Sequence, residues 1–70
     1  MESQMITFER GGFLETCVVD FNRCEMYSSI GNSGVGEVYP TMAALVIARD
    51  RHIKYRLDDG WKILDGKNEG

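Results

Sequence analysis

The sequence predicts a small α+β domain with the element order β-β-β-loop-α-β-β, in which one helix packs on one face of an antiparallel sheet. Short segments with alternating apolar and polar residues fill the first part of the chain, an Ala-rich run after a Pro-Thr step indicates one helix, and alternation returns after residue 51. The 70 residues, 43% hydrophobic and 27% charged, are typical of one globular domain with a small core.

The first two strands are predicted at Met5–Arg10 and Phe13–Phe21, joined by a two-residue turn at Gly11-Gly12. A tight turn fixes the register of this hairpin. The predicted pairs are Arg10 with Phe13, Phe8 with Glu15 and Ile6 with Cys17. This register gathers a mainly apolar face that also carries Arg10 and Glu15 as diagonal neighbours; its apolar residues are Ile6, Phe8, Phe13, Cys17, Val19 and Phe21. We expect that face to be the core face of the sheet.

A third strand is predicted at Cys24–Ser29, after a turn at Asn22-Arg23, with Val19 opposite Met26. The register keeps Cys17 and Cys24 apart, so we expect two small buried hydrophobic side chains rather than the alternative, a disulfide. Their spacing contains no C-x-x-C, which indicates neither a zinc site nor a redox motif.

Residues Ile30–Glu37 contain three glycines and no periodicity, so we predict a flexible connector, with a mobile contact loop as the alternative. A phosphate-binding loop was also considered, because backbone amides of glycine-rich loops bind phosphates. It is excluded because Gly36 is followed by Glu37 and Val38, where that motif requires Lys and then Ser or Thr.

A helix is predicted from Pro40 or Thr41 through the apolar run Met42–Ala48, because Pro suits the first turn, Thr can cap it and Ala favours helix. A buried strand is the alternative for this run. The period of two at His52–Leu57 then predicts a strand.

A hairpin turn is predicted at Asp58-Asp59-Gly60, and Trp61–Leu64 is predicted to return as the last strand. Residues 65–70 hold no apolar residue, so we expect a disordered tail after a single domain at residues 1–64.

Catalytic residues are not indicated. The single histidine, His52, has no Ser or Cys beside it in the predicted register, and the adjacent acids Asp58 and Asp59 fit a turn better than a facing pair. We expect a protein that is not an enzyme and that uses no cofactor and no metal. The first residues contain no secretory signal, so a cytoplasmic protein without a membrane anchor is expected.

The strongest signal for a contact is the basic segment near the predicted last hairpin, because Arg and Trp are frequent in binding hot spots. The residues assigned to partner binding are Arg49, Arg51, His52, Lys54, Arg56 and Trp61. Two alternatives remain: this strand tracks a nucleic-acid backbone, or its charges are only solvated while Tyr55 and Trp61 lie in the core. The net charge of −3 disfavours nucleic acid.

The predicted strand, Thr-opened helix and basic strand over Val38–Leu57 resemble the layout of small phage-encoded host-takeover proteins, some of which bind host RNA polymerase. This resemblance implies binding to a large host enzyme complex, with the transcription machinery as a target and inhibition as one mode of action. We expect a protein-binding module of this kind, with a weak nucleic-acid binder as the alternative. A homodimer is a further possibility, because the core is small and the strand edges are uncovered.

Overall fold

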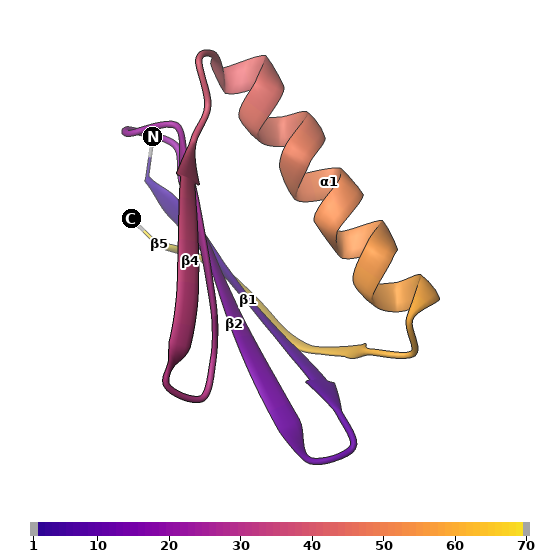
Figure 1. Cartoon of the computed structure of the whole chain (residues 1–70). Coiled ribbons are helices and arrows are strands. Elements are labelled where there is room, and N and C mark those ends of the chain that lie inside the picture. Colours follow the sequence, from indigo (N-terminus) through magenta and orange to yellow (C-terminus); the bar gives the residue numbers. More distant parts are fainter. Residues whose placement is uncertain (1, 70) are drawn as a thin grey trace.

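The computed structural model describes the backbone of residues 2–69 and the side chains of residues 2–64. Its elements are β1 (Ser3–Arg10), β2 (Phe13–Asp20), β3 (Glu25–Ile30), β4 (Ser33–Val38), α1 (Met42–Asp58) and β5 (Lys62–Glu69). The strands form one antiparallel sheet in the order β4-β3-β2-β1-β5. Helix α1 covers one face of that sheet (Figure 1). The predicted α+β class is therefore confirmed.

The three-stranded meander has the predicted register. Strand β1 pairs Arg10 with Phe13 and Phe8 with Glu15, and β2 pairs Val19 with Met26 of β3. The turn between β1 and β2 works because Gly11 and Gly12 adopt positive φ angles of 57° and 87°. The turn geometry and the alternation of apolar residues thus select the same pairing.

The prediction of a flexible connector at Ile30–Glu37 was wrong, because strand β4 occupies most of that segment. A turn at Gly31-Asn32 returns the chain beside β3, from the pair Ile30–Ser33 to the pair Glu25–Val38. The glycines of β4 serve close packing, because the Tyr27 ring lies against them: a Cβ at Gly36 would approach Tyr27 Cδ1 to 3.1 Å. Glycine here marks contact with an aromatic ring, not flexibility.

Helix α1 begins where the sequence predicts and continues much further. Thr41 Oγ1 accepts a hydrogen bond from the Ala44 amide at 3.1 Å, which caps the helix. The helix runs to Asp58, so the prediction of a strand at His52–Leu57 was wrong.

The predicted hairpin turn after residue 57 is instead the end of α1. Asp59 donates its backbone N–H to carbonyl groups of the last helical turn, and Gly60 has a φ of 90°. Trp61 then donates its backbone N–H to the Arg56 carbonyl at 3.0 Å. This arrangement closes the helix and turns the chain back toward the sheet.

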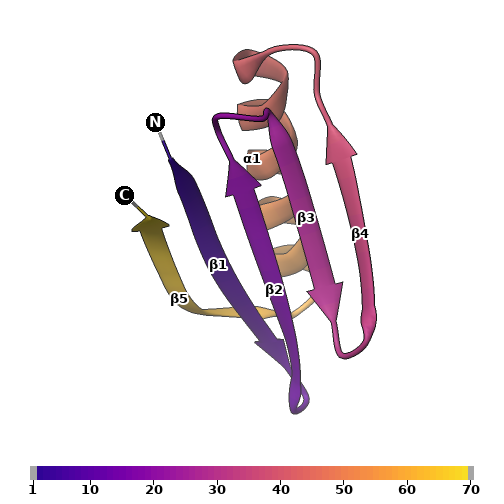
Figure 2. The same ribbon diagram turned by 90° about the vertical axis from the view of Figure 1, so that its left-hand side faces the viewer.

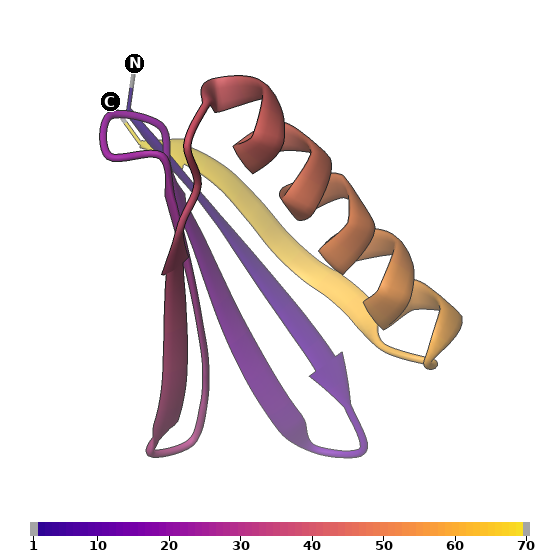
Figure 3. The same ribbon diagram turned by 45° about the horizontal axis from the view of Figure 1, so that its top comes forward.

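The last strand pairs with the first. Strand β5 runs beside β1 from the pair Glu9–Lys62 to the pair Ser3–Glu69, with a register shift at Thr7/Phe8. Residues 65–69, expected to belong to a disordered tail, continue this strand in the structure, while residue 70 lies outside the described residues. Figure 3 shows β5 bending along its length under α1.

The core lies between α1 and the middle of the sheet. Its buried hydrophobic residues are Ile6, Phe8, Cys17, Val19, Leu45 and Trp61. In Figure 2, α1 lies behind the middle strands, whereas β4 stands at one edge of the sheet. The helix of the described chain is neither long enough nor apolar enough to span a membrane.

Candidate functional site

A carboxylate lies inside the interface between the helix and the sheet. The register of β2 turns Glu15 to the same face as Cys17 and Val19, and the Glu15 side chain is only 1% exposed. A carboxylate at such a position is costly unless cations or hydrogen-bond donors meet it. The surrounding structure must therefore supply partners for Glu15.

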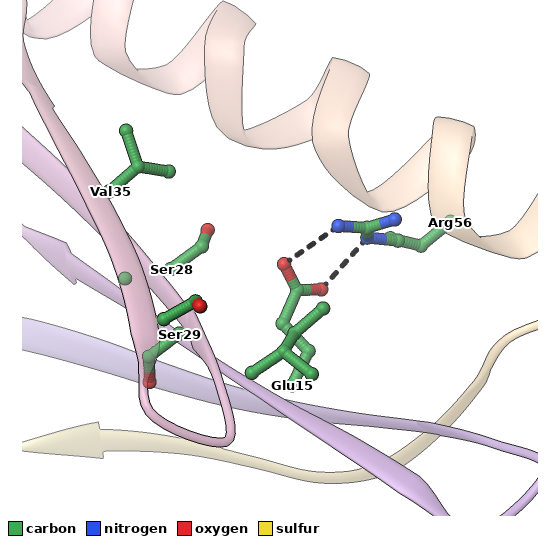
Figure 4. Close-up of a pocket in the computed structure, with 8 residues that line it drawn as sticks. Glu15, Ser28, Ser29, Val35 and Arg56 are labelled. Carbon is green, nitrogen blue, oxygen red and sulfur yellow. Dashed lines mark hydrogen bonds and ion pairs between the residues drawn. The ribbon is translucent and has the colours of Figure 1, made fainter.

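Helix α1 supplies those partners from one face. Leu45, Arg49, His52 and Arg56 follow one another at spacings of four, three and four residues, so they share a side of the helix. Arg56 donates to both Glu15 oxygens, with Nε–Oε1 at 2.9 Å and Nη2–Oε2 at 3.1 Å. Figure 4 shows this paired contact. Planar matching of guanidinium and carboxylate makes it a strong form of ion pair.

His52 completes the cluster. Its Nε2 lies 3.2 and 3.1 Å from the two Glu15 oxygens, and its ring meets Phe8 edge-on with centroids 5.7 Å apart. The Arg56 guanidinium also stands 5.0 Å from the centre of the Trp61 ring. We call Glu15, His52 and Arg56 the buried polar cluster; in it, His52 and Arg56 meet both oxygens of the Glu15 carboxylate.

The thiol beside this cluster is poorly suited to nucleophilic chemistry. Burial raises the pKa of Cys17 above its ordinary value, the negative charge of Glu15 adds to that effect, and a hydrogen bond with Ser28 opposes it in part. A raised pKa keeps the group as a thiol at neutral pH, whereas the thiolate is the reactive form. Within the described residues, no three His, Cys, Asp or Glu side chains gather to hold a metal.

An open groove adjoins the buried polar cluster on the side of β4. Two hollows of about 240 and 180 Å³ share Glu15, Ser28, Val35 and Arg56 in their walls. In Figure 4, Val35 and Ser28 stand on the strands, and Arg56 reaches from the helix toward the same space. We call this space the β4–α1 groove; most of the surface it exposes is apolar, although serines and Glu37 line it as well as the cluster.

Tyr39 follows β4 and lies where the β4–α1 groove meets a third hollow of about 390 Å³, which Met26 and His52 also line. The Tyr39 hydroxyl donates to Glu37 Oε1 at 3.3 Å, and Tyr39 borders the second hollow together with Met26 and His52. Burial, and then the neighbouring Glu37 carboxylate, raise the pKa of Tyr39. The tyrosine therefore stays a neutral hydrogen-bond donor at this end of the groove.

The residues predicted to bind a partner do not share one surface. Those at the inner side of α1 point into the fold: His52 and Arg56 bind Glu15, and Arg49 donates to Gln4 Oε1 at 3.2 Å. Trp61 is 9% exposed and belongs to the core.

The two remaining candidates are exposed; Lys54 lies on the outer side of the helix, and Arg51 borders a hollow that His52 and Tyr39 also line. The Lys54 Nζ lies 2.9 Å from Asp58 Oδ2. The basic residues are therefore divided between the interior and the surface, because a helix, unlike the predicted strand, turns them about its axis. Tyr55, which the sequence left open between core and surface, is 64% exposed.

No family model, curated protein or solved structure matched the chain. The function is therefore argued from the geometry of the chain itself.

Sequence reasoning missed the β4–α1 groove and the contacts of Arg56 and His52 with Glu15 beside it. The register had already placed Glu15 on the core face, and an isolated carboxylate among apolar residues requires a buried cation. This requirement was a signal in the sequence that some basic side chains, here Arg56 and His52, point into the fold toward Glu15. Val35 gives no signal of its own, because the glycines around it predict a connector.

Proposed function

We propose that the protein is a non-enzymatic binding module that modulates a larger protein complex by occupying part of its surface through strand β4 and the β4–α1 groove. The observation that carries this proposal is the position of β4 at the edge of the sheet beside the hollow near Val35. All six residues of β4 are exposed there. Exposed apolar surface next to an open strand edge is typical of protein-binding sites.

The polar groups support the same proposal. The Glu15 carboxylate is engaged by Arg56 and by His52 Nε2, and the Cys17 thiol is held protonated by burial. A free base and an activated nucleophile would be needed for covalent chemistry. We therefore assign the cluster to holding the helix on the sheet, and assign function to the surface beside it.

The nucleic-acid alternative has less support from this arrangement. The basic side chains that would track phosphates are split between the inside and the outside of α1, and Lys54 is matched by Asp58. Binding along a phosphate backbone requires several cations on one surface. The transcription machinery, RNA polymerase included, is the first target to test, but the geometry lends it no separate support, because the basic strand in the layout that resembled host-takeover proteins is the end of α1. The free thiols of Cys17 and Cys24 fit a reducing cytoplasm.

The test is affinity capture from bacterial lysate with nuclease treatment, using wild-type protein, Val35→Lys and Leu14→Lys. Val35 borders the groove, whereas Leu14 lies on β2 at an exposed position outside it, so the two variants add the same charge in different places. We expect a stoichiometric protein that survives nuclease, is lost with Val35→Lys and is kept with Leu14→Lys. Capture that disappears on nuclease treatment would contradict the proposal.

A further inference from the structure

Strand β4 has a free edge whose backbone groups are available for pairing. The Tyr39 amide donates to the Cys24 carbonyl at 2.7 Å, which marks that pair as hydrogen-bonded. Bonded and non-bonded pairs alternate along an antiparallel ladder. The residues whose backbone N–H and C=O groups turn away from β3 are therefore Gly34, Gly36 and Val38.

The usual protections of an edge strand are missing from β4. Its six pairs with β3 run without a bulge, and its sequence contains one charged residue, Glu37, and neither Lys nor Pro. Natural sheets commonly place such features on their edges to prevent pairing with other chains. An edge that lacks them can serve as a template for another strand.

The groove adds side-chain selectivity to this edge. Side chains alternate between the two faces of a sheet, so residues of an added strand that lie opposite Val35 and Glu37 would face the groove. The hollow of about 240 Å³ beside Val35 is walled on the strand side by Ile30 and Val35 together with Gly34 and the small side chains of Ser28, Ser29 and Ser33. This space suits one bulky aliphatic or aromatic side chain.

Charge at the other end of β4 specifies a second position. Glu37 lies on the groove side, and a Glu25 carboxylate oxygen lies 3.6 Å from the Cβ position of Gly36 on the opposite face. Among the described side chains, no cation pairs with Glu37, which is held only by the Tyr39 hydroxyl. A basic side chain opposite Glu37 would therefore be attracted to this end.

We infer that β4 binds an extended segment of a partner protein, which adds to the sheet as a sixth strand. The segment carries a bulky apolar residue opposite Val35 and Lys or Arg two positions away, opposite Glu37. This inference rests on the proposed function and specifies how the partner is recognised: backbone pairing gives affinity, and the two side chains give selectivity.

A second copy of the chain is a poorer occupant of the same edge. If two β4 strands pair antiparallel about Val35, each Glu37 faces Ser33 of the other copy, so no cation meets the carboxylate. The chain also carries a net charge of −3, which repels a second copy. Val35 of the second copy would face the groove opposite Val35, but valine is smaller than the bulky side chain that the hollow of about 240 Å³ suits.

The test selects binders from a display library of random ten-residue linear peptides. We expect enriched peptides to contain a basic residue two positions from a bulky apolar one, and an enriched synthetic peptide to shift the amide NMR signals of Gly34, Gly36 and Val38. N-methylation of the peptide residue that pairs with Gly36 should weaken binding at least tenfold, because it removes one backbone donor. An unrelated protein serves as the selection control.

Variants of the protein test the same geometry from the other side. Val38→Pro removes an N–H that points to the free edge without removing a bond to β3, so it should abolish peptide binding while the rest of the amide spectrum is kept. Val35→Lys should also abolish peptide binding, because it places a charge in the groove, and Leu14→Lys should bind the peptide like wild type. Retained binding with both Val38→Pro and the N-methylated peptide would overturn strand addition.

Other outcomes separate this inference from the proposed function. In the peptide selection, no enrichment over the control, or enrichment of acidic peptides, overturns the inference of strand addition. In the lysate capture, a protein that is bound by wild type and lost with Val35→Lys still supports the proposed binding module. A dimer in sedimentation that Val38→Pro dissociates overturns the choice of a partner segment in favour of a second copy. Failure of lysate capture together with failure of selection removes both proposals.

Discussion

The two halves of the contact between α1 and the sheet are built differently. Near the start of the helix, Leu45 is fully buried among Phe8, Val19 and other apolar residues of the sheet. Toward its end, the same face of the helix carries His52 and Arg56, which hold Glu15 beside an open groove. Apolar packing closes one half, while directional bonds hold the other half and leave room beside it. A binding surface next to the core is possible because ion pairs fix a distance without filling space.

The largest effect is expected when the polar half loses one partner. Arg56→Ala leaves the Glu15 carboxylate buried with only His52 beside it, so we expect the free energy of unfolding to fall by about 3–5 kcal/mol. Urea denaturation measures this loss. Lys54→Ala is the control, because the exposed Lys54–Asp58 pair should contribute less than about 1 kcal/mol.

The double variant Glu15→Leu with Arg56→Leu sharpens the test. If the pair mainly avoids an uncompensated charge, this variant should be more stable than Arg56→Ala, since apolar replacements of buried pairs are often tolerated. Equal losses in both variants would contradict that account and assign the stability to the bonds themselves.

The apolar half should respond to loss of volume. Leu45→Ala removes a fully buried side chain, and we expect a loss of about 2–5 kcal/mol in the free energy of unfolding. Ile47→Ala is the matched control on the same helix, because Ile47 is 52% exposed. A Leu45→Ala effect no greater than that of Ile47→Ala would show that the apolar half is not closed.

A smaller effect on the free energy of unfolding is expected from a rise in pH, because Cys17 is buried in the core beside the polar half. The folded thiol has a pKa above its ordinary value near 9.0, so the unfolded chain loses this proton first as pH rises. Stability contributed by the protonated thiol is complete below that value and declines between the ordinary pKa and the raised pKa. Tyr39, whose pKa is also raised, acts in the same direction at higher pH.

Urea denaturation between pH 7.5 and pH 10 measures this decline. Cys17→Ala should show a flatter dependence on pH than wild type, whatever its stability at pH 7.5, and Cys24→Ala should keep the wild-type dependence. An unchanged slope in Cys17→Ala would show that the thiol titrates alike in the folded and unfolded states.

The smallest effect is expected in the groove. Val35 is 70% exposed, so Val35→Lys should change the free energy of unfolding by no more than about 0.5 kcal/mol. Thermal unfolding followed by circular dichroism checks this expectation. A large loss would mean that the groove belongs to the core, and the binding defects expected for this variant would then have no specific meaning.

Sequence reasoning succeeded where local rules determine the structure. The turn at Gly11-Gly12 and the alternation on either side fixed the register of β1 and β2, and the Pro-Thr step located the start of α1. These features depend on neighbouring residues, so they can be read without knowing the rest of the fold.

It failed where distant contacts decide. Gly34 and Gly36 suggested a connector, yet their role depends on Tyr27 of the adjacent strand. His52–Leu57 alternates over a short stretch, and its helical period is hidden because the buried face carries His52 and Arg56 instead of apolar residues. Because the groove lies between β4 and the end of α1, these two errors made it impossible to predict the groove from the sequence.

The pairing of β1 with β5 determines where additional chain would leave the molecule. Ser3 lies opposite Glu69, so the two ends of the described chain emerge side by side, across the sheet from β4 (Figure 2). An affinity tag or a fused protein joined at either end would therefore start on the β1–β5 side of the sheet, away from β4. The same proximity makes circular permutation practical: a short linker can join the ends, and new termini can be opened at the turn between β2 and β3 without cutting the strand that faces a partner.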